Sequence, residues 1–170
     1  MSKFAQIAMA LTATASIAIA TPAAAQDVIP TPEQAAEAFK AICMDNAGDH
    51  QAQAKAASAA PWNMKKSKDS NDKRTYFDNF PWQLSLSTTD SALKICAITT
   101  AAEAGLTDAQ SRNATVAVLG PRPADLEAVD DGYYWTPSIK GRDYMVMYQT
   151  KIFPNDGKPM TVVSYGLSWK

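Results

Sequence analysis

The chain has 170 residues, with 16 Lys plus Arg against 17 Asp plus Glu and a formal net charge of −1 at pH 7. So balanced a charge argues against densely negative partners, and we expect neither nucleic acid nor an anionic membrane surface. The sequence holds one histidine and two cysteines, and it shows no zinc-ligand spacing, Gly-rich phosphate loop or Gly-X-Ser-X-Gly motif. We therefore predict no bound metal, no cofactor and no catalytic group of these kinds.

The first 25 residues have the pattern of a secretory signal peptide. Lys3 supplies a basic start, residues 4–20 are apolar and rich in alanine, and small residues precede a cleavage site near Ala25. We expect a bacterial protein that is periplasmic or secreted, with a single domain at 26–170. No second apolar run is long enough to span a membrane. Losing Lys3 leaves 15 basic against 17 acidic residues, a charge of about −2.

Cys43 and Cys96 are the two cysteines. An even count in an exported chain favours one disulfide. It would close a loop of about 50 residues, which the chain-entropy estimate values at roughly 4 kcal/mol at best. The alternative, a reactive redox pair, lacks the close Cys-X-X-Cys spacing.

The N-terminal part of the domain predicts two helices. Thr31, Pro32 and Gln34 form a capping box with proline at the first helical position. Apolar residues follow on one helical face, at Ala35, Phe39, Ile42 and Cys43. Asp49 caps a second helix at 50–59. We interpret the basic stretch Lys65–Arg74 as a solvated loop, or alternatively as a docking site for an acidic partner.

Two strands are predicted at 80–88 and 93–100, from the alternation of apolar and polar residues. A two-residue turn between them pairs Leu86 with Ile95, which sends Cys96 to the opposite face from Trp82. A disulfide to the first helix then requires helices on both faces of the sheet, unless the turn is one residue longer. The sequence leaves both alternatives open.

The second half predicts one helix and three strands. Thr107 and Gln110 form a capping box that opens a helix extending to about Val118. An acidic loop at 124–131 leads to a strand that begins at Tyr133, and residues 143–170 form a long hairpin around Asp156 and Gly157.

That hairpin has a predicted register. Counting outward from the turn pairs Tyr148 with Tyr165 and Val146 with Leu167 on one face, which we expect to be core. The other face then carries small or mixed pairs, among them Met147 with Gly166 and Met145 with Ser168.

Together these elements predict an α+β fold with an antiparallel sheet of about five strands, an N-terminal helix, one crossing helix and one disulfide. In element order the prediction is similar to profilin-like and roadblock-like topologies.

Four groups of residues could carry a function. His50 could pair with Asp49 or Asp45, or with Cys43 if that thiol is free, although a solvent-facing histidine is the simpler interpretation. The acids Asp125, Glu127, Asp130 and Asp131 precede an aromatic run and could suit a glycan site. Trp135 and Tyr134 could form an aromatic platform, and Met145 and Met147 a shallow adaptable groove.

We favour a non-catalytic module that binds a protein, a peptide or an envelope component. The alternative hypothesis is a small glycan or peptide hydrolase that uses the acids near Asp130. The sequence indicates no oligomeric state.

Overall fold

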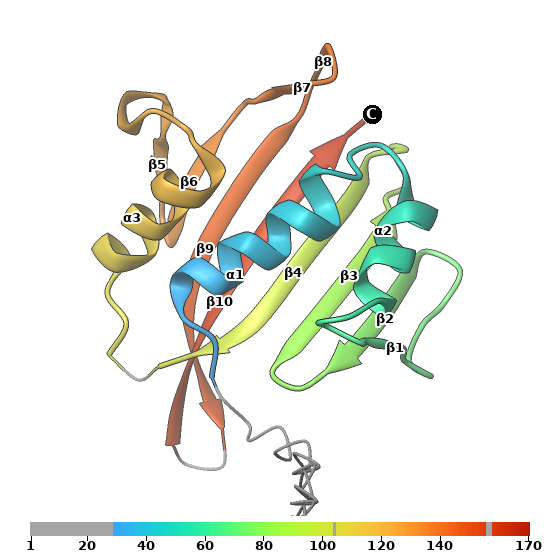
Figure 1. Cartoon of the computed structure of the whole chain (residues 1–170), viewed down its shortest axis with the longest axis horizontal. Helices are drawn as coiled ribbons and strands as arrows, with labels where there is room; N and C mark the ends of the chain where they lie inside the picture. Colours follow the sequence, from blue (N-terminus) through green and yellow to red (C-terminus); the bar gives the residue numbers. More distant parts are fainter. Residues whose placement is uncertain (1–28, 104, 156–157) are drawn as a thin grey trace, which may run out of the picture.

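The structure is a computed structural model that describes residues 29–103, 105–155 and 158–170. The predicted signal peptide and the predicted turn at Asp156 and Gly157 lie outside the described residues. The α+β class and the antiparallel sheet are confirmed, but the sheet has eight strands instead of about five (Figure 1).

The eight strands are ordered β1-β2-β3-β4-β10-β9-β6-β5, and all neighbouring pairs are antiparallel. Their bounds are β1 (Lys65–Lys66), β2 (Arg74–Asn79), β3 (Trp82–Thr88), β4 (Lys94–Ala102), β5 (Glu127–Val129), β6 (Gly132–Trp135), β9 (Met145–Asn155) and β10 (Lys158–Trp169). A separate small hairpin is formed by β7 (Ser138–Ile139) and β8 (Arg142–Asp143).

Three strands of the eight-stranded sheet were not predicted: β1, β2 and β5, which lie toward its two edges. β1 and the first residue of β2 fall in the predicted basic loop, and β5 falls in the predicted acidic loop. Phe77 is the only buried residue of β2, and all three residues of β5 are exposed. These strands therefore lack the alternation of apolar and polar residues by which a half-buried strand is recognised.

The helices are α1 (Pro32–Phe39), which continues as the π-helical turn η1 (Lys40–Met44), then α2 (His50–Ser58), α3 (Asp108–Leu119) and the short 3-10 turn η2 (Pro123–Asp125). Both predicted capping boxes form, at Thr31 and at Thr107. The carboxylate of Asp49 accepts hydrogen bonds from the first backbone amides of α2, as predicted.

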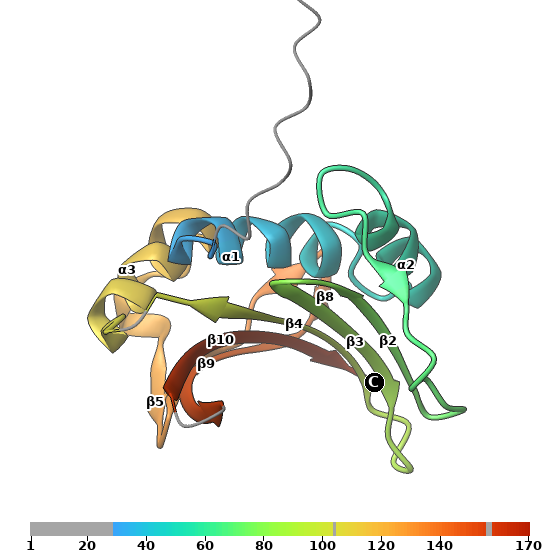
Figure 2. The same cartoon turned by 90° about the horizontal axis from the view of Figure 1, so that it is seen from below.

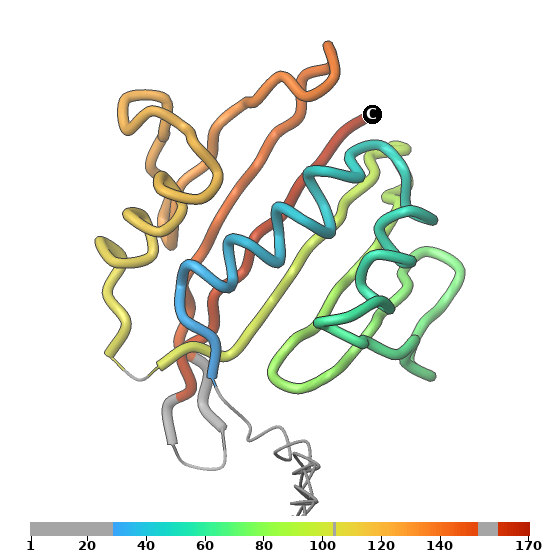
Figure 3. The backbone as a smooth tube through the Cα atoms, viewed as in Figure 1, coloured from blue at the N-terminus to red at the C-terminus, as the bar shows by residue number. Residues whose placement is uncertain are grey.

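All three α-helices lie on the same face of the sheet (Figure 2). Helix α1 crosses β10 and β4 diagonally, with α3 on one side of it and α2 on the other (Figure 3). The core fills the space between this layer and the sheet, and its largest fully buried side chains include Phe39, Ile42, Leu84, Tyr148, Tyr165 and Leu167. No described helix covers the opposite face, which we call the open face (Figure 2).

The registers of the two long hairpins decide which residues reach this open face. Between β9 and β10, Tyr148 pairs with Tyr165 and Met147 with Gly166, as predicted. Between β3 and β4, Leu86 pairs with Cys96, so the turn is one residue longer than the two-residue alternative. With this longer turn Cys96 lies on the helix-covered face. The disulfide to Cys43 can therefore form with helices on one face of the sheet only.

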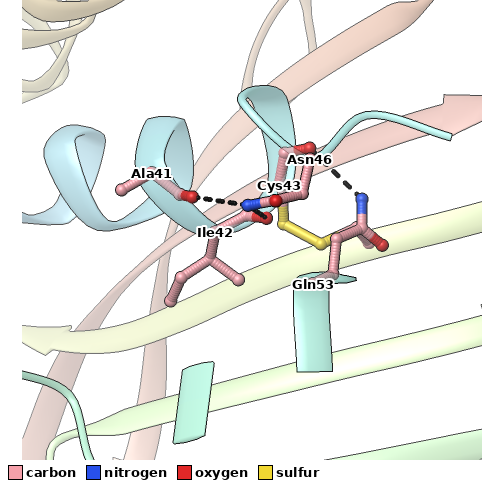
Figure 4. The surroundings of a disulfide bond; sticks show 6 residues. Ala41, Ile42, Cys43, Asn46 and Gln53 are labelled. Carbon is pink, nitrogen blue, oxygen red and sulfur yellow. Dashed lines mark hydrogen bonds between the residues drawn. A yellow bond between two sulfur atoms is a disulfide. The ribbon is translucent and has the colours of Figure 1, made fainter. Parts of the chain in front are cut away.

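The predicted disulfide between Cys43 and Cys96 is present, with Cα atoms 5.8 Å apart and both residues fully buried. It connects η1 to the middle of the sheet (Figure 4). Gln53 of α2 donates its side-chain amide to the carbonyl of Cys43 at 3.2 Å, and Asn46 donates to the carbonyls of Ala41 and Ile42 at 2.9 and 3.2 Å. The cross-link therefore fixes the helical layer to β4.

Candidate functional site

The centre of the open face is built from small side chains. Neighbours that pair directly across antiparallel strands share a face, so the register assigns one row of alternating residues from each of the strands β3, β4 and β10. We call these eight residues the floor: Ser85, Ser87, Ile95, Ala97, Thr99, Ser164, Gly166 and Ser168. Apart from Ile95, each is Ser, Thr, Ala or Gly. Thr99 and Ser164 hydrogen-bond to each other through their hydroxyl groups at 3.0 Å.

Gly166 is the middle floor residue of β10, between Ala97 of β4 and Met147 of the border strand β9. A Cβ atom added at Gly166 would meet no other atom within 4 Å, so the space above this position is open. Glycine inside a strand costs roughly 0.5–1 kcal/mol relative to alanine. Strand glycines often mark a place where a ligand or another backbone approaches closely.

Larger side chains border the floor on two sides. On β2, Arg74 donates to the hydroxyl of Tyr76 at 3.1 Å, and its guanidinium carbon lies 5.9 Å from the centre of that ring. On β9, Met145 is 46% exposed and Met147 is half-buried. The strands β2 and β9 are four spacings apart in the sheet, which at about 4.8 Å each separates the two borders by about 19 Å. The open face therefore has a small-residue floor wide enough for a helix or an extended segment.

Tyr134 continues the methionine border, because it pairs with Met147 in the register. Its hydroxyl donates to the carboxylate of Glu127 on β5. This hydrogen bond raises the pKa of Tyr134 above its ordinary value, so the phenol is neutral and polar at the edge of the floor.

Three of the four residues predicted for binding therefore lie together on the open face: Met145, Met147 and Tyr134. The fourth, Trp135, points to the helix-covered face, where it pairs with Val146 and is only 5% exposed. Strand alternation separates the adjacent residues Tyr134 and Trp135 onto opposite faces. Trp135 is a core residue, and we do not include it in the binding surface.

The acids of the hydrolase hypothesis have separate partners. Asp125 accepts two hydrogen bonds from Arg122, at 2.9 and 2.7 Å, which hold the pKa of this carboxyl below its ordinary value. Asp131 lies 3.6 Å from the ammonium of Lys151. Within the described ranges, no group of three or more potential ligands could hold a metal ion. The hydrolase hypothesis stays a prediction, and its test is whether Asp130→Asn abolishes turnover of cell-wall material.

His50 lies at the start of α2, and its ring meets Trp169 edge-on with centroids 5.2 Å apart. Burial, followed by the charge of Lys94, lowers the pKa of His50. The sulfur of Cys43 is bound to Cys96, which removes the thiol from the Cys–His pair considered from sequence.

A pocket that the sequence interpretation missed opens at one end of the floor, beside the turn between β2 and β3. It has a volume of about 290 Å³, and its lining includes Asp78, Phe80, Pro81, Ala101, Met160 and Val162. We call it the end pocket. The available signal was a proline between two aromatic residues, Phe80 and Trp82, because proline favours a turn or strand end over the strand interior predicted there.

No protein-family model matches the chain, and the searches of curated proteins and of solved structures found no match either. The similarity in element order to profilin-like and roadblock-like topologies therefore stays a prediction. Among the helices of the described ranges, none has the length and apolar character needed to cross a membrane.

Proposed function

We propose that the protein is a non-catalytic binding module that holds a partner protein, peptide or envelope component on the open face of its sheet. The observation that carries this proposal is Gly166, a glycine at the centre of the sheet with open space above it. Ordinary strand residues would stabilise β10 better at this position. A glycine at this position lets a partner approach the backbone of the sheet more closely than a larger side chain would.

The border of the floor supports the same proposal. Met145 and Met147 are flexible apolar side chains, which adapt their shape to a partner and are common at binding surfaces. Tyr76 and Tyr134 add aromatic rings with polar tips, a type of side chain that is enriched at interfaces. The open face therefore combines a low centre with adaptable and aromatic edges.

We also propose that this binding takes place in the bacterial periplasm or outside the cell. The pattern of residues 1–25 supports export, and the buried disulfide fits an oxidising compartment, where such bonds persist. Cell fractionation together with the intact mass tests this directly. We expect the exported form to begin at Gln26 and to contain no free thiol.

The binding proposal is tested with paired substitutions on one strand. Met145→Asp and Met147→Asp place a carboxylate at the border of the floor, and we expect each to reduce partner capture from cell-envelope extract at least tenfold. Ile152→Asp is the matched control, because Ile152 lies on the same strand, is 71% exposed and points to the opposite face. All three variants should keep the wild-type melting temperature to within a few degrees, since each replaces an at least partly exposed side chain.

The comparison has a clear opposite outcome. If Ile152→Asp reduces capture as much as the methionine variants do, or if the methionine variants capture every wild-type partner, the open face is not the binding surface.

A further inference from the structure

The end pocket has an apolar wall formed by residues from three parts of the sheet. Phe80 and Pro81 come from the turn between β2 and β3, Ala101 from β4, and Met160 and Val162 from β10. The amide of Ala101 donates to the carbonyl of Pro81 at 3.3 Å, which ties the turn to the sheet. Phe80 is 65% exposed, so its ring is accessible to a partner side chain.

The pocket is continuous with the floor. Gln83 and Thr99 both line the pocket and pair with each other. On the open face they are the next pair after Ser85 and Ala97. Thr99 is itself a floor residue. A partner segment that lies on the floor can therefore extend one side chain into the pocket.

Asp78 supplies the negative charge of this pocket. Of the described residues that line it, Asp78 is the only one that carries a charge. Gln83 donates its side-chain amide to one carboxylate oxygen of Asp78 at 3.0 Å. Lys65 of β1 is the direct cross-strand partner of Asp78, but among the described residues no salt bridge joins these two side chains. Lys151, which pairs with Val162, has its ammonium 3.6 Å from Asp131. The lining thus presents a carboxylate beside an apolar wall and no basic group of its own.

This combination matches a long cationic side chain. Lysine and arginine carry an aliphatic stem that packs on apolar surface and a charged end that needs an acidic partner. A short apolar side chain would cover the wall and leave the carboxylate of Asp78 without a cationic partner inside the pocket. A small inorganic cation would satisfy Asp78 and leave the wall uncovered.

We propose that the end pocket binds the side chain of a lysine or arginine from the partner segment that occupies the open face. This inference rests on the proposed function and names the chemistry of the partner. The bound residue stacks its stem on Phe80 and Met160 and places its charged end at Asp78.

The pocket is tested by NMR titration of the isotope-labelled protein with Nα-acetyl-lysine methylamide. We expect saturable shifts at the backbone amides of Thr99, Ala101 and Val162. The neutral probe Nα-acetyl-norleucine methylamide, whose side chain has the four carbons of lysine but no ammonium group, should bind at least fivefold more weakly. Asp78→Asn should reduce lysine-probe affinity to the norleucine level, whereas the exposed and distant Asp69→Asn should leave it unchanged.

A second variant tests the pocket independently, in case Asp78→Asn does not fold. Phe80→Ser changes a largely exposed side chain, so the protein should remain folded while lysine-probe affinity falls about threefold or more. Equal affinity for the lysine and norleucine probes would overturn the charge assignment. Absence of saturable shifts at the pocket amides would overturn the site itself.

The two proposals fail in distinguishable ways. If the lysine probe binds as expected but Met147→Asp still captures every partner, the pocket stands and the open face is not the partner surface. If Met147→Asp loses partners but the lysine probe does not bind, the binding face stands and the cationic anchor is wrong.

Discussion

Replacement of Gly166 should separate stability from binding. Alanine at this position places its Cβ in open space, and Gly166 does not adopt the left-handed backbone conformation that would strain another residue. Alanine also reduces the conformational entropy of the unfolded chain, so we expect Gly166→Ala to raise the free energy of unfolding by roughly 0.5–1 kcal/mol. For a domain of this size that corresponds to an increase in melting temperature of about 1–4 °C.

The same substitution should weaken binding, because its side chain occupies the open space above β10, beside the methionine border. Gly166→Leu extends this effect further above the sheet, and we expect at least a tenfold loss of partner affinity, equivalent to about 1.4 kcal/mol. Gly132→Ala is the matched contrast. A Cβ at Gly132 would lie 1.9 Å from the carbonyl oxygen of Tyr148, so the backbone must move and the protein should lose several kcal/mol of stability.

The assay combines thermal unfolding with partner capture for the same three variants. The expected pattern is a more stable Gly166→Ala, a folded Gly166→Leu that no longer captures partners, and a destabilised Gly132→Ala. A destabilised Gly166→Ala would show that the space above the floor is not open. A Gly166→Leu variant that binds normally would show that the floor is not in contact with the partner.

Three further predictions concern stability. Reduction of the Cys43–Cys96 disulfide, which spans a sequence separation of 53, should cost about 4 kcal/mol and lower the urea midpoint by about 2 M at a typical m-value; a shift below about 0.5 M would contradict this. Burial and the charge of Lys94 lower the pKa of His50 in the folded protein, and Asp49 opposes this more weakly. Folding therefore favours the neutral imidazole. This contribution to stability is complete above the unfolded pKa near 6.5 and is lost as the pH falls through the lower folded pKa. Urea unfolding from pH 7.5 to 5 should show this slope, and His50→Gln should flatten it; an unchanged slope would exclude His50 as its source. Ala92→Gly should stabilise the protein by about 1 kcal/mol, because Ala92 adopts a φ of 61° that costs a non-glycine residue energy, and a lower melting temperature of the glycine variant would refute this.

Much of the fold could be predicted because its signals are local. The capping boxes at Thr31 and Thr107 depend on residues three positions apart, and both form as predicted. The register of the β9–β10 hairpin follows from its turn and from strand alternation, which also put Met145 and Met147 opposite Ser168 and Gly166. The predicted groove residues consequently lie on one face in the structure.

The candidate site was predicted only in part, because it depends on neighbours that are distant in sequence. The floor needs β3 and β4 beside β10, and the register between β3 and β4 was left open by a turn that could have two lengths. Trp135 was predicted on the binding surface but lies in the core. An aromatic residue in a strand is compatible with either position, so its type does not distinguish them. The end pocket joins the β2–β3 turn to β10, and no local pattern connects Asp78 with Val162.

The sequence by itself determined the elements that are stabilised by short-range interactions: the helix starts, the long hairpin with its two faces, and the cysteine pair as the only disulfide available. Tertiary structure alone decided that the α-helices share one face, that Cys96 lies beneath them and that none of the described helices covers the opposite face. The physical reason is that helix placement minimises exposed apolar area over the whole sheet. Which surface is then left uncovered depends on all strands together, so no single segment encodes it.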